Sequence, residues 1–194
     1  MRLPYVANPP PARTRQDAEI IERIQQRRAP RGLQPLDLAL LHSPPLADGW
    51  NSFLGAVRTK TNLAADLREL AISRVAVCNR AWYEWKHHAP LAVEAGVSNE
   101  ALETVKQEGE LAEVEKPAEL NDRQWAVLLY TDEMTRNVQI RDKTFARLES
   151  LFDDREVVEI TGTVAAYNCV SRFLVALDGK APGLTTHVAN WFIF

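Results

Sequence analysis

The chain has 194 residues, enough for one domain with its own hydrophobic core, so 1–194 is expected to fold as a single domain without stabilising disulfides. Its 23 basic and 26 acidic residues give a net charge of -3, which argues against a nucleic-acid or anionic-membrane surface, because both require clustered Lys and Arg. The expected partners are a small molecule and further copies of the chain.

The N-terminal segment, 1–45, holds most of the prolines and is expected to wrap around the rest of the chain rather than fold independently. A helix is predicted to start near Thr14, a residue type that favours helix starts, and to present one stripe of isoleucines. Pro35 suits a first helical position and predicts a short second helix, which a Ser-Pro-Pro turn ends. A third helix is predicted over 46–58.

The segment 64–79 has apolar residues at helical spacing on more than one side, which predicts a buried helix. Glu69 lies within it, and a buried carboxyl needs a partner or a raised pKa. The alternative is that Glu69 points outward and pairs with Arg68 or Ser73.

The next predicted helix carries an acid/base constellation within residues 81–90. Glu84 and His88 are spaced i, i+4 and therefore share one face, and His87 is a neighbour of Glu84 at i, i+3. Pro90 has no N–H to donate, so the helix is expected to kink there.

The remaining chain shows helical spacing up to 177, except in the acidic segment 109–119, which we interpret as a solvated connection without a site. Strand-like alternation is absent, so the predicted fold is an all-α bundle. The apolar tail, 181–194, is expected to dock on its own bundle or on a neighbouring subunit.

Cysteine content and hydropathy indicate the compartment. Cys78 and Cys169 each lie in an apolar run, which predicts buried free thiols in a reducing environment rather than a disulfide. No stretch approaches the roughly 20 continuous apolar residues of a membrane span, and the N-terminus has no apolar signal-peptide core. A soluble cytoplasmic protein is therefore expected.

Three phrases together resemble the carboxymuconolactone decarboxylase family, within the alkylhydroperoxidase D-like superfamily: LRELAI at 67–72, YEWKHHAPLA at 83–92 and EAG at 94–96. Their order and spacing carry the resemblance, and a fainter match covers almost the whole chain. The resemblance implies an all-α fold and an obligate homo-oligomer, commonly a trimer or hexamer, with a dimer as the alternative.

The peroxidase branch of that superfamily uses a Cys-x-x-Cys pair, a His four residues after it and a Glu on the preceding helix. Ala81 and Glu84 stand at the two cysteine positions here, so thiol peroxidase activity is not expected. The resemblance leaves Glu69, Glu84 and His88 as the catalytic residues.

Decarboxylation beside a carbonyl or lactone leaves an enolate-like carbanion, which a positioned acid must protonate. Glu69 and Glu84, if adjacent, would titrate as a coupled pair and keep one carboxyl protonated at neutral pH. His88 would act as a base or as a cation that anchors the substrate carboxylate. The predicted function is a cofactor-independent decarboxylase of a small carboxylated lactone or related ring.

Four further residues are predicted to contact the substrate. Tyr83 and His87 are polar candidates, and Trp82 and Trp85 would line an apolar pocket, although such indoles more often belong to a core or a subunit interface.

Two other functions fit the same residues. An isomerase or cyclase that tailors secondary metabolites would use the same acid and base, and a catalytically degenerate oligomeric scaffold or binding protein would keep Glu69 and His88 as a structural ion pair. A metal site is not expected, because Glu84 and His87 form one Glu-x-x-His motif and a di-iron bundle needs a second. The other histidines, His42 and His187, do not follow a Glu at that spacing.

Overall fold

The computed structural model describes residues 2–177, and every regular element in this range is a helix, which confirms the all-α prediction. The apolar tail, 181–194, lies outside the described residues. The described chain divides into two compact units, one formed by residues 2–55 together with 174–177, and the other by Ala56–Phe173.

The first unit begins with an extended arm that leads into α1, Arg15–Arg28. Thr14 caps this helix in a capping box with Asp17, so two backbone N–H groups at the helix start are satisfied by side chains. Helix α2, Pro35–Leu40, begins at its proline as predicted, and α3, Pro44–Thr59, starts in this unit. The helices predicted for the N-terminal segment are therefore confirmed.

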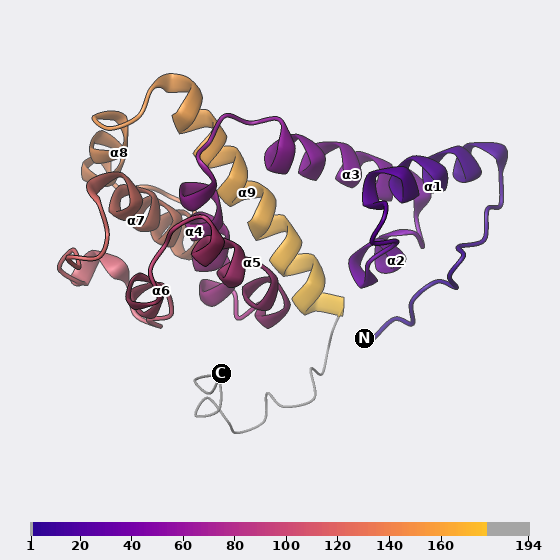
Figure 1. Cartoon of the computed structure of the whole chain (residues 1–194), viewed down its shortest axis with the longest axis horizontal. Coiled ribbons are helices and arrows are strands. Elements are labelled where there is room, and N and C mark those ends of the chain that lie inside the picture. The colour runs from indigo at the N-terminus through magenta and orange to yellow at the C-terminus, as the bar shows by residue number, and fades with distance from the viewer. Residues whose placement is uncertain (1, 178–194) are drawn as a thin grey trace. The chain divides into compact units, whose positions relative to one another are not determined.

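The second unit contains the remaining helices. They are α4 (Ala65–Cys78), α5 (Trp82–Glu94), α6 (Asn99–Val105), the short 3-10 helix η1 (Leu111–Glu113), α7 (Asp122–Asn137), α8 (Asp142–Glu149) and most of α9 (Asp154–Leu177). Helix α4 packs against both α5 and α7 and lies between them in Figure 1. Because α4 has neighbours on several sides, its apolar residues are buried all round, as its sequence predicts.

One apolar cluster joins α4, α5, α6 and α7. Leu70, Ala89, Val105 and Trp125 all belong to it, and each is at most 7% exposed. Since Leu70 and Ala89 directly follow Glu69 and His88 in sequence, this cluster fixes the two helices that carry the predicted catalytic residues.

A fully buried arginine ties α4 to α7. The Arg74 guanidinium donates to Asp132 Oδ1 at 2.9 and 2.5 Å and to the carbonyl oxygens of Val105 and Gly109 at 2.7 and 2.8 Å. Burial favours the neutral form of Asp132, but the charge of Arg74 and hydrogen bonds from Arg136 and Arg74 outweigh it and lower the Asp132 pKa. This network holds the connection after α6 against the core.

Three expectations need correction. Leu111, in the acidic segment 109–119, is fully buried, because its backbone N–H donates to Asp132 and its side chain joins the core. Cys169 is a free but exposed thiol, because it lies on an outward face of α9. Helix α9 is also long and apolar enough, by length and composition, to cross a membrane, although core residues such as Val164 are buried within the protein.

Candidate active site

Glu69 and His88 form a buried pair between α4 and α5. Their side chains are 3% and 7% exposed, and His88 Nδ1 lies 2.6 Å from Glu69 Oε2. Arg68 Nε also lies 3.3 Å from Glu69 Oε1, so the pairing considered from sequence exists beside the buried one. The packing of α4 against α5 therefore brings together residues that are 19 positions apart.

The environment lowers the pKa of both partners, which leaves one ionised and the other neutral. Burial would raise the pKa of Glu69, but the hydrogen bond from His88 and the positive charges of Arg58 and Arg68 lower it. Burial lowers the pKa of His88 despite the carboxylate beside it. At neutral pH we therefore assign a neutral His88, whose Nδ1–H donates to an ionised Glu69 and whose Nε2 keeps a free lone pair.

Glu84 is a second buried carboxyl, one helical turn before His88 on α5. It is 2% exposed, and neither of its carboxyl oxygens has a hydrogen-bond partner within residues 2–177. Burial raises the Glu84 pKa to about 9, so the group is protonated at neutral pH. The sequence suggested that the charge of Glu69 would share in this shift, but desolvation accounts for it.

The predicted catalytic residues Glu69, Glu84 and His88, called the acid/base cluster below, are thus all buried on the two packed helices α4 and α5. Glu69 is an ionised acceptor, His88 a neutral base and Glu84 a protonated acid. A neutral His88 does not supply the cationic anchor that was one of its two predicted roles, and its free nitrogen fits the other, that of a base.

Tyr167, on α9, also contacts the cluster, and the sequence analysis did not identify it. Its ring stands edge-on to His88, with centroids 5.0 Å apart and an angle of 83° between the ring planes. Burial raises the pKa of Tyr167, and the charges of Glu69 and Glu84 add to the shift, so the phenol keeps its proton. Nothing in the sequence separates this tyrosine from the apolar positions around it.

Arg58, in the last turn of α3, is the second residue that the sequence did not indicate. Its half-buried guanidinium lowers the pKa of both Glu69 and His88 through its positive charge. A cation therefore lies close enough to the cluster to act on both of its ionisable partners.

The four residues predicted to contact substrate divide into two groups. The Tyr83 and His87 rings lie 4.4 Å apart, and Trp82 meets Tyr83 edge-on at 6.1 Å, so these three rings form a patch on the less buried side of α5. Trp85 instead packs against the apolar cluster, with Lys106 Nζ 5.9 Å from its ring. Trp85 thus packs against the core, whereas the other three rings lie together on α5, and their contact with substrate stays a prediction.

Among the residues that the structure describes, no group of three or more His, Cys, Asp or Glu side chains is arranged to hold a metal ion.

Part of the chain matches a known protein family. Residues 44–119 match the carboxymuconolactone decarboxylase family, which confirms the resemblance seen in the sequence. A search of curated proteins gave no significant match.

Solved structures share the fold. The alkylhydroperoxidase AhpD core protein of Ralstonia eutropha, described as peroxidase-related, superposes with a TM-score of 0.71 at 16% identity, covering 94% of this chain and 92% of its own. A peroxidase-related protein of Silicibacter gives 0.68 at 17% identity, with 90% of each chain covered. The debrominase Bmp8 in complex with 2,3,4-tribromopyrrole gives 0.67 at 16% identity, covering 85% of this chain and 87% of its own. These structures establish an AhpD-like fold.

Proposed function

Because residues 44–119 match the carboxymuconolactone decarboxylase family, we propose that the protein is a cofactor-independent acid/base enzyme that decarboxylates a small carboxylated lactone or a related ring. The observation that carries this proposal is Glu84, a buried carboxyl that stays protonated at neutral pH with both oxygens unpaired within the described chain. An acid of this kind is what a carbanion intermediate requires.

In the proposed reaction the bond between the ring and the carboxylate breaks, and CO2 leaves. The electron pair of that bond moves into the ring as an enolate conjugated with the lactone carbonyl. Glu84 then transfers its proton to carbon and becomes a carboxylate, which its buried surroundings disfavour. The unfavourable charge on Glu84 drives its reprotonation, which completes the cycle.

His88 supplies the route for that proton. Its Nδ1–H is held by Glu69, so its Nε2 takes a proton from solvent and passes it to Glu84, one helical turn away on α5. Glu69 positions the ring and stabilises the imidazolium formed in transit. Arg58 adds a positive charge that favours a substrate carboxylate near the cluster.

An isomerase is the second candidate, and one observation favours it specifically. The cluster holds a neutral base, His88, together with a protonated acid, Glu84, and a proton shift between two carbons needs such a pair. The two reactions separate by product: a decarboxylase releases CO2, whereas an isomerase exchanges a carbon-bound proton with D2O and releases none.

Oligomerisation and compartment belong to the same proposal. We place the protein in the cytoplasm as a homo-oligomer, a trimer or hexamer, with a small molecule as its other partner and no nucleic acid. A degenerate scaffold would keep the Glu69–His88 pair for assembly and show no turnover.

The test compares Glu84→Gln with Glu94→Gln, which removes an exposed carboxylate from the same helix. CO2 release is measured at pH 7 on a panel of carboxylated lactones, beginning with 4-carboxymuconolactone. Glu84→Gln should lower turnover by about 100-fold or more, while Glu94→Gln keeps wild-type turnover. CO2 release by Glu84→Gln at the wild-type rate, or no turnover by the wild type on any carboxylated ring, would refute the proposal.

A further inference from the structure

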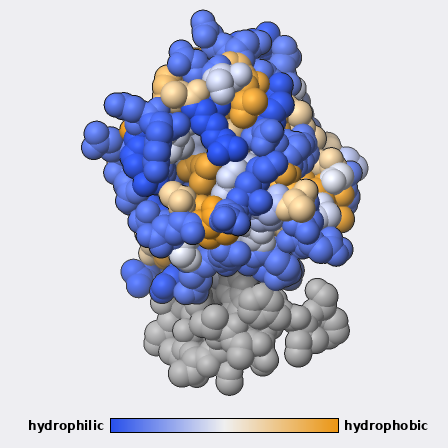
Figure 2. Space-filling model, turned by 90° about the vertical axis from the view of Figure 1, so that its left-hand side faces the viewer, coloured by the Kyte–Doolittle hydropathy of each residue, from blue (hydrophilic) through white to orange (hydrophobic). Residues whose placement is uncertain are grey.

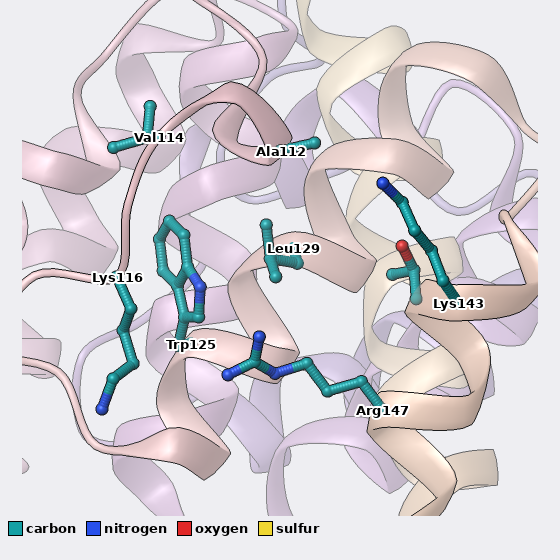
Figure 3. Close-up of a pocket in the computed structure, with 8 residues that line it drawn as sticks. Ala112, Val114, Lys116, Trp125, Leu129, Lys143 and Arg147 are labelled. Carbon is teal, nitrogen blue, oxygen red and sulfur yellow. The ribbon is translucent and has the colours of Figure 1, made fainter.

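A pocket of about 410 Å3 lies between α7, α8 and the segment that follows η1, and none of its lining residues belongs to the acid/base cluster. Trp125 and Leu129 are spaced i, i+4 on α7, and Lys143 and Arg147 are spaced i, i+4 on α8, so each helix directs one face into the pocket. Figure 3 shows Arg147 reaching from α8 toward the Trp125 ring, with Lys116 on the other side of that ring.

The residues that line the pocket include three cations, Lys116, Lys143 and Arg147, and no acidic side chain. Lys116 Nζ and Arg147 Nη2 lie 3.0 and 3.8 Å from the same Asp122 oxygen, so two cations share one exposed carboxylate. Lys143 forms no ion pair with any residue in the described part of the chain. The lining is therefore positively charged, although the whole chain has a net charge of -3.

Trp125 adds a directed donor. The residue is 2% exposed and lines the pocket with its indole ring. In Figure 3 the indole nitrogen lies on the side of the ring that faces Leu129 and Arg147. An indole N–H is a donor only, so a ligand oxygen at this position would accept its hydrogen bond.

Apolar surface completes the pocket. Leu129 and Val114 are half-buried and line it beside the indole. Figure 2 looks onto the side of the molecule that carries α7 and α8 and shows apolar side chains set among mainly hydrophilic ones. The lining thus combines an apolar wall with donors at one end, and the pocket has the size of a small-molecule site.

We propose that this pocket binds a small carboxylate with a flat apolar body, of which benzoate is the simplest example. The carboxylate accepts the hydrogen bond of the Trp125 N–H between Lys143 and Arg147, and the ring contacts Leu129 and Val114. This second site does not depend on the proposed decarboxylase activity, because the two share no residue.

The experiment follows the indole N–H resonances of the 15N-labelled protein by NMR, with the Trp125 signal assigned from Trp125→Phe. Benzoate should shift this resonance saturably. The double variant Lys143→Gln/Arg147→Gln should weaken benzoate binding about tenfold or more, while Lys60→Gln, an exposed lysine outside the pocket, leaves it unchanged. Benzyl alcohol, the neutral analogue, should bind at least tenfold more weakly.

Four results would overturn the proposal. If benzyl alcohol binds as tightly as benzoate, the cations do not contribute to binding through the carboxylate. Inorganic phosphate competing as well as benzoate would show a site for simple anions without the apolar wall. Loss of benzoate binding in His88→Ala but not in the double variant would locate it at the acid/base cluster. A change of oligomeric mass in the double variant would make this face an interface between copies.

Discussion

Glu84→Gln should make the stability of the protein less sensitive to pH. A glutamate in the unfolded chain has its ordinary pKa of 4.5, and burial raises the Glu84 pKa to about 9 in the folded protein. Between these values the folded state holds a proton that the unfolded state has lost. The contribution of Glu84 to stability is therefore fully present below pH 4.5 and is lost as the pH rises toward 9.

The magnitude follows from the shift. Each pH unit in this window costs the wild type about 1.4 kcal/mol of folding free energy. The interval from pH 6.5 to 9 suits the measurement, because the lowered pKa values of Glu69 and His88 place their titration below it. Over that interval the wild type should lose about 3 kcal/mol relative to Glu84→Gln, and the gap between their thermal midpoints should widen by roughly 6 to 12 °C.

Thermal unfolding of both proteins is followed by circular dichroism in steps of pH, at one protein concentration because assembly affects the midpoint. Glu94→Gln controls for the loss of a carboxylate from α5. A gap between wild type and Glu84→Gln that stays constant from pH 6.5 to 9 would show that Glu84 ionises normally, and the assignment of a neutral acid would be wrong.

Further predictions concern the other members of the site and the core. Turnover should fall below pH 6.5, because His88 then takes up a proton, and again near pH 9, because Glu84 then loses one. A pH–rate profile that is flat over this range would contradict both assignments. Glu69→Gln should lower turnover by about 100-fold and move the acidic limb to lower pH, because the carboxylate raises the His88 pKa; an unmoved limb would contradict this. His88→Ala should lower turnover similarly with the oligomer intact in size-exclusion chromatography, and dissociation into monomers would instead favour the scaffold reading. Arg74→Met should lower the free energy of unfolding by about 3 kcal/mol or more in a denaturant titration, because it leaves Asp132 buried without its main partner.

Local signals in the sequence were sufficient to predict where several helices begin. Thr14 and Asn121 cap their helices in capping boxes, Ser98 accepts from the N–H three residues on, and Pro35 opens α2, as their residue types predict. Each signal acts within one or two turns, so no knowledge of the tertiary fold was needed to read it.

The candidate site could be predicted in part for the same reason. Glu84 and His88 lie on one helix, where spacing fixes their relation, and the family resemblance supplied Glu69 on the preceding helix. Tyr167 and Arg58 come from α9 and α3, and their proximity depends on packing that no local pattern encodes. Burial is likewise a tertiary property: it makes His88 neutral, and the sequence alone could not choose between a base and a cation.

The two buried carboxyls, Glu69 and Glu84, differ in protonation state because the His88 imidazole hydrogen-bonds only to Glu69. Glu69 receives the His88 N–H and the nearby positive charge, so its ionised form is stabilised despite burial. Glu84, on the same helix as His88, receives no hydrogen bond within the described chain, and its neutral form is favoured by desolvation. A glutamine or a leucine would occupy this position without the loss of stability above pH 4.5. A carboxyl that weakens the fold at neutral pH and is retained one helical turn from a neutral base is better explained by proton transfer than by packing, because functional sites are where proteins tolerate such local costs.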